Sequence, residues 1–136
     1  MDGDLDLALA NNADPDGTHP LYVNGLPAAL GARSLQVLIL DGQGRLTRAG
    51  TKVTATAEDI VPEHPEGFRT ARLLDAGGGY SSQGAPPAHF GFPSWVTRAT
   101  VHVEWFEKGQ PRTATVSGVE LAAFQHKWLV LRLGVQ

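Results

Sequence analysis

Residues 100–105, TVHVEW, decide the class of fold, because apolar and polar residues alternate strictly along them. Val101, Val103 and Trp105 fall on one face of an extended chain, and the polar residues between them fall on the other. This two-residue period is typical of a strand that covers a core with one face and meets water with the other. We therefore expect Trp105 to be buried.

Further short segments of strand character lie on both sides, separated by turns rich in Gly, Pro, Asp and Asn. Between residues 121 and 128, LAAFQHKW, we expect a helical turn at most, and we expect the segment at 127–133 to be a last, more buried strand. The whole pattern predicts an all-β protein, a β-sandwich of about seven short antiparallel strands. The segments are SLQVLIL (34–40), TKVTATA (51–57), RTARLLD (69–75), PRTATV (111–116) and KWLVLRL (127–133).

Composition restricts the classes of function. The chain has 136 residues, 42% of them hydrophobic, which suits one buried core, and its 11 Lys and Arg form no basic run that would bind nucleic acid. It contains no cysteine, so disulfides, thiolate metal sites and a cysteine nucleophile are excluded. The sequence has neither a signal peptide nor an apolar run long enough to span a membrane, so an export signal would have to lie upstream of Met1.

The N-terminal segment, residues 1–25, differs from the rest in being acidic and rich in turns. Its two short apolar runs, LDLALA (5–10) and PLYV (20–23), are separated by Asn-Asn and Asp-Pro-Asp-Gly. Such runs fit short strands joined by tight turns.

The segment at 77–92, GGGYSSQGAPPAHFGF, followed by the alternating strand, resembles the signature of the ASPIC/UnbV family (cartilage acidic protein-like domains). That signature contains Gly-x-Gly-Tyr-x-Ser-Gln, then His-Phe-Gly, then a strand with alternating Val that ends in Trp. The resemblance covers roughly residues 26–133, with departures at Phe92-Pro93 and Trp105-Phe106 and an apparent insertion at 58–68. The matching residues are Gly77, Gly79, Tyr80, Ser82, Gln83, His89, Phe90, Gly91 and Trp105.

This resemblance implies a β-sandwich domain over residues 26–136 and an extracellular or periplasmic location. It also implies a non-catalytic, C-terminal accessory module of a larger exported protein, with a role in adhesion or protein–protein interaction. The glycines from Gly77 onward would supply positive φ angles, and the loop's polar side chains would bond the loop's own backbone.

Residues 1–25 are similar to the end of an FG-GAP or VCBS-type repeat, which has an Asp-rich calcium loop and a closing strand. The similarity rests on Asp2-Gly3-Asp4-Leu5-Asp6-Leu7 and on 21–24, LYVN. It implies that Asp2 and Asp6 stand at liganding positions, that Asp4 would offer its carbonyl, and that propeller-type repeats upstream are the partner. The first two carboxylates of such a loop would precede Met1, so we expect weak calcium binding or none.

Two other functions remain open. Tyr80 and Trp95 would form an aromatic platform if the chain were a carbohydrate-binding module. Ser82, His89 and Asp75 supply the residue types of a Ser/His hydrolase, but the sequence around Ser82 lacks the Gly-x-Ser-x-Gly elbow. We expect no catalytic residue and no cofactor.

Overall fold

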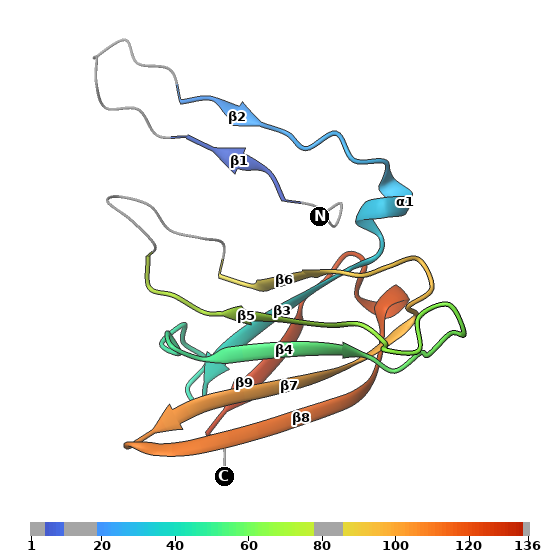
Figure 1. Cartoon of the computed structure of the whole chain (residues 1–136). Coiled ribbons are helices and arrows are strands. Elements are labelled where there is room, and N and C mark those ends of the chain that lie inside the picture. Colours follow the sequence, from blue (N-terminus) through green and yellow to red (C-terminus); the bar gives the residue numbers. More distant parts are fainter. Residues whose placement is uncertain (1–4, 10–18, 78–85, 135–136) are drawn as a thin grey trace.

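The computed structural model describes residues 5–9, 19–77 and 86–134, and about half of these residues lie in strands. Seven strands of the described part form two sheets that enclose one core, so the prediction of an all-β sandwich is confirmed (Figure 1). One sheet has the order β5-β4-β7-β8, and the other has the order β6-β3-β9. The strands are β3 (Ser34–Asp41), β4 (Lys52–Ala57), β5 (Arg69–Leu73), β6 (Ala88–Gly91), β7 (Arg98–Glu107), β8 (Gln110–Glu120) and β9 (Leu129–Leu133).

The core is built from the inward residues of both sheets, which alternate with outward residues along each strand. Phe90 on β6 is fully buried at its centre, and Trp105 on β7 is 9% exposed, as the alternation predicted. Other side chains with almost no exposure come from both sheets: Leu35, Val37, Ile39, Val53, Val101 and Val103.

The strand at the C-terminal end of the described chain differs from the prediction in two ways. β9 runs parallel to β3, with Val37 opposite Leu129 and Asp41 opposite Leu133, whereas antiparallel pairing was expected. The strand is also less buried than expected, because Val130 is 47% exposed. β9 pairs with β3 alone, at the edge of its sheet, and of its four apolar residues Val130 is the exposed one.

The long hairpin of β7 and β8 closes through a tight turn at Lys108 and Gly109. Both residues have positive φ angles, 51° and 76°, as a two-residue turn between twisted strands requires. Near the other end, a β-bulge lies between Ala99 and Val101 on β7, across from the stretch of β8 in which Gly118 has a φ of 69°. β8 is the edge of its sheet.

The N-terminal part forms a separate antiparallel hairpin, β1 (Leu7–Ala8) with β2 (Leu21–Tyr22), as the two apolar runs predicted. Figure 1 shows it on the side of β5 and β6, and residues 5–8 line a hollow together with Arg72 of β5 and His89 of β6. A short helix, α1 (Ala28–Gly31), leads from the hairpin into β3, and the expected helical turn at 121–128 is a 3-10 helix, η1 (Leu121–Phe124). In the described residues no helix is long and apolar enough to cross a membrane.

Candidate functional site

The two ends of the loop at 77–92 are anchored differently. Gly77 has a φ of 137°, a conformation that favours glycine, as expected. At the other end the chain enters β6, which pairs with β3, so the His-Phe-Gly triplet lies in a strand rather than in the loop. His89 and Gly91 therefore point outward while Phe90 points into the core. Gly79, Tyr80, Ser82 and Gln83 lie outside the described residues.

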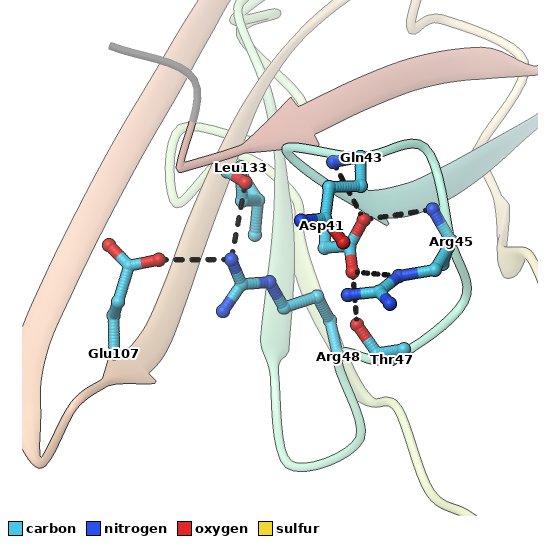
Figure 2. Close-up of polar contacts among 7 residues, drawn as sticks. All are labelled: Asp41, Gln43, Arg45, Thr47, Arg48, Glu107 and Leu133. Atoms are coloured by element: carbon cyan, nitrogen blue, oxygen red, sulfur yellow. Dashed lines mark hydrogen bonds and ion pairs between the residues drawn. The ribbon is translucent and has the colours of Figure 1, made fainter.

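A polar network closes the end of the sandwich where β3 ends (Figure 2). The Asp41 carboxylate is 6% exposed and accepts hydrogen bonds from the backbone N–H groups of Gln43 and Arg45, the Arg45 side chain and the Thr47 hydroxyl, all at 2.8–2.9 Å. These bonds, led by the one from the Arg45 backbone and then the one from Thr47, hold the pKa of Asp41 far below its ordinary value. Asp41 is therefore a turn-forming anion and has no proton to give at neutral pH.

Arg48 links that end to both sheets. Its Nη2 donates to Glu107 Oε1 at 3.0 Å, at the end of β7, and to the carbonyl of Leu133 at 3.2 Å, at the end of β9 (Figure 2). Gly134 follows with a φ of 81°, and a Cβ placed there would lie 2.7 Å from Glu107 Oε1. Position 134 therefore requires glycine for the bridge to close.

The opposite end is closed by two neighbouring carboxylates that follow β4. Asp59 accepts hydrogen bonds from the backbone N–H of Thr97 at 2.6 Å and of Arg98 at 2.9 Å. Glu58 accepts from the Gly118 N–H and from the Thr100 hydroxyl, both at 2.6 Å. These bonds lower the pKa of Asp59, chiefly through the Arg98 N–H, and the pKa of Glu58, chiefly through the Gly118 N–H. Both side chains serve to fix loops.

The aromatic platform expected at Tyr80 and Trp95 has only one member in the described residues. Trp95 is half-buried, packs against the core, and carries the His64 ring stacked on it at 5.4 Å between centroids. His64 comes from the loop at 58–68, the insertion relative to the family signature. Its Nδ1 lies 3.3 Å from Glu66 Oε1. One face of the Trp95 indole is thus covered by the protein itself.

Two outward side chains of β7 contact neighbouring strands of the same sheet. His102 Nδ1 lies 2.9 Å from the Thr115 hydroxyl on β8, and Glu104 forms an ion pair with Lys52 on β4 at 3.0 Å. The hydrogen bond and the charge of Lys52 lower the pKa of Glu104. Within the ranges that the structure describes, no three His, Asp or Glu side chains gather as metal ligands.

The acidic N-terminal loop is described only at Asp6. Its Oδ1 accepts a hydrogen bond from the Asn24 N–H at 2.9 Å, which ties the first strand run to the second. Asp2 and Asp4 lie outside the described residues, so the structure presents one carboxylate of the predicted calcium loop.

A model of the ASPIC and UnbV family matches residues 42–127. The chain belongs to the ASPIC and UnbV family. Domains of this family are of an extracellular type. No curated protein and no solved structure matches the chain. The family match contains β4 to β8 in full, but it begins after β3 and ends before β9.

Sequence reasoning missed the residues that distinguish the outer surface of this ASPIC/UnbV domain. Trp128 was assigned to a buried strand, but it is 39% exposed and its indole N–H donates to Gln36 Oε1 at 2.9 Å. No local signal marks this contact, because 92 positions separate the two residues. Asp41 did have a signal: an Asp at the start of Asp-Gly-Gln-Gly is typical of a side chain that bonds its own turn.

Proposed function

We propose that this chain is a non-catalytic binding module, and that its β1–β2 hairpin docks on the β-sheet of an FG-GAP or VCBS-type propeller protein. One observation carries the proposal: Leu5, Leu7 and Leu9 alternate as in a buried strand, yet the apolar residues of the hairpin are 45–67% exposed. They are Leu5, Leu7, Leu9, Leu21, Tyr22 and Val23.

The geometry of the hairpin supports this docking. Leu7 is paired with Tyr22, so these two side chains share a face, and the two-residue period places Leu5 and Leu9 on it as well. An isolated two-stranded hairpin is marginally stable in water and needs further strands or a packed layer. A sheet that added a strand beside β1 or covered this face would supply both.

The non-catalytic part of the proposal is supported by the state of the acidic groups. Every described carboxyl with a shifted pKa is shifted downward: Asp41, Glu58, Asp59, Glu66 and Glu104. A general acid at neutral pH needs a raised pKa, and a general base needs one close to the working pH. These carboxylates are instead engaged with backbone N–H groups and neighbouring side chains.

The setting follows from the family and from the N-terminal resemblance. We place the module in an exported protein, in the extracellular space or periplasm, where it would serve adhesion or protein–protein interaction. Residues 1–25 would belong to the propeller-type repeat, and residues 26–136 would form the ASPIC/UnbV sandwich. Calcium would bind only where the remaining carboxylates of the loop were provided. The proposal assigns no cofactor to the sandwich.

The test is direct binding to a propeller-type repeat protein of the same genome, produced separately and followed by titration calorimetry. We expect the wild-type chain to bind and Leu7→Asp to weaken binding by at least about tenfold, since a charge would be buried against an apolar sheet. Phe106→Asp is the matched control, because Phe106 is 72% exposed on β7, away from the hairpin. Absence of wild-type binding, or equal loss in both variants, would overturn the docking proposal.

The hydrolase alternative is tested separately. The non-catalytic proposal predicts that the wild-type chain does not hydrolyse a panel of p-nitrophenyl esters above the rate of the buffer. Turnover that disappears in Ser82→Ala or His89→Ala would contradict it.

A further inference from the structure

A strip of aromatic, apolar and basic side chains lies on the outward face of the three-stranded sheet. β9 has its odd-numbered residues turned toward the core, so Val130 and Arg132 point outward, with Trp128 just before the strand on the same side. Pairing with β3 brings Leu38 beside Val130 and Leu40 beside Arg132. We call this surface the Trp128 strip: Gln36, Leu40, Trp128, Val130 and Arg132, with Leu38 on the same face but only 8% exposed.

The Trp128 ring is held in place on this face. Its only polar atom, Nε1, donates to Gln36 Oε1 on β3 at 2.9 Å, which fixes one edge of the indole to the sheet. The N–H is thereby satisfied, and 39% of the residue remains exposed. A fixed indole with an exposed surface offers a π-face that attracts C–H groups with a partial positive charge.

The charges around the strip have one sign. In the described part of the chain, Arg132 and Lys127 are not within ion-pair distance of a carboxylate. Among β3, β6, β9 and residues 125–128, the one carboxylate is Asp41, whose oxygens already accept bonds from its own turn. Such a face favours an anionic ligand.

We propose that the Trp128 strip binds an acidic polysaccharide, one whose pyranose rings carry carboxylates. A pyranose has a face of C–H groups that stacks on the fixed indole, and its carboxylate pairs with Arg132. Along an extended strand Trp128 and Arg132 are about 13 Å apart, which places the ring contact and the charge contact on different sugars of one chain. The ligand is therefore a polymer rather than a monosaccharide.

The composition of the surface favours a polysaccharide over an acidic peptide. Trp128 and Arg132 offer a ring and a guanidinium on the face of the sheet, and a sugar ring needs only a flat aromatic surface and a few polar contacts. Peptides are usually held in a groove or along a free strand edge, where their backbone groups find partners. β9 has a free edge because it pairs with β3 alone, so an acidic peptide is the other occupant, which poly-glutamate tests.

The experiment uses polygalacturonate as the probe, with dextran as a neutral polysaccharide and poly-glutamate as an anion without sugar rings. Binding is followed by Trp fluorescence and by affinity electrophoresis. We expect binding to polygalacturonate, a loss of at least about tenfold in Trp128→Ala, and a weaker dependence on salt in Arg132→Gln. Phe106→Ala removes an exposed aromatic ring from the other sheet and should bind as wild type.

Trp128→Phe keeps a ring but loses the N–H, so its partial retention of binding would separate stacking from a general loss of fold. Three results would overturn the proposal: no binding to polygalacturonate, undiminished binding in Trp128→Ala, or equal binding to dextran. Poly-glutamate that binds as tightly as polygalacturonate would assign the strip to acidic peptides instead. The hairpin docking does not enter this experiment, so Leu7→Asp should leave polysaccharide binding unchanged.

Discussion

The two outward faces of the sandwich are finished in different ways. On the four-stranded sheet the outward side chains satisfy one another across strands, as Lys52 does with Glu104 and His102 does with Thr115. On the three-stranded sheet, apolar Val130 and the Trp128 ring are exposed beside Arg132, which makes no ion pair with the residues that the structure describes. Exposed apolar side chains also remain on the four-stranded sheet, at Leu73 and Phe106, so the second face differs in having an indole that is fixed by Gln36 and lies near a cation.

The two sheets also differ in how much of each the family match covers. The ASPIC/UnbV match includes every strand of the four-stranded sheet, whereas β3 and β9, which carry most of the Trp128 strip, lie outside residues 42–127.

The largest expected effect comes from opening a cavity in the core between the two sheets. Phe90→Ala replaces a fully buried ring and should lower the free energy of unfolding by about 3–5 kcal/mol, because a cavity remains between the sheets. Urea denaturation measures the change. Phe106→Ala, which alters an exposed ring, should stay within about 0.5 kcal/mol of wild type. Similar losses in the two variants would contradict the assigned inner and outer positions.

The next effect concerns the turn at the end of β3. Asp41→Asn removes the charge that accepts four hydrogen bonds and should lower the melting temperature by about 5–8 °C at neutral pH. The folded pKa of Asp41 lies below its ordinary value of 3.8, so the carboxylate contributes stability above pH 3.8 that disappears as the pH falls toward the folded pKa. Thermal unfolding between pH 7 and pH 2 should therefore show the variant approaching wild type in acid. A constant difference across that range would be inconsistent with this role.

The sequence predicted the four-stranded sheet much better than the Trp128 strip. Strict alternation along residues 100–105 was enough to identify β7, its partner β8 and the burial of Trp105, because neighbouring strands in a hairpin are set by local turns. The parallel pairing of β9 with β3 joins segments about 90 residues apart, and an apolar run such as LVL does not reveal whether one of its faces will be covered. The stacking of His64 on Trp95 could not be predicted for a related reason, since His64 belongs to a loop distant in the sequence.

A smaller effect on stability is expected at Thr54 in the four-stranded sheet. Thr54 is 1% exposed, and its Oγ1 has no hydrogen-bond partner among the residues that the structure describes. Thr54→Val keeps the shape and removes the unsatisfied hydroxyl, so it should raise the free energy of unfolding by about 1 kcal/mol. Thr113→Val, at an exposed position of β8, provides the control and should change little. Destabilisation by Thr54→Val would indicate that the hydroxyl is satisfied in solution.

The smallest effect is expected on the strip itself. Val130→Thr replaces an exposed apolar side chain by one of similar shape and β propensity, so stability should change by less than about 0.5 kcal/mol. Chemical denaturation checks this, and polygalacturonate binding by the same variant should weaken. A stability loss above about 1 kcal/mol would show that Val130 belongs to the core rather than to a free surface.

The contrast between the two faces leads to the proposal that the Trp128 strip binds an acidic polysaccharide. The most direct test is an NMR titration of the wild-type chain with polygalacturonate, in which backbone amide shifts are followed residue by residue. The account predicts shifts concentrated at Gln36, Leu38 and residues 127–132, with the amides of β5, β4, β7 and β8 unchanged. Shifts confined to the four-stranded sheet, or none at saturating polysaccharide, would contradict it.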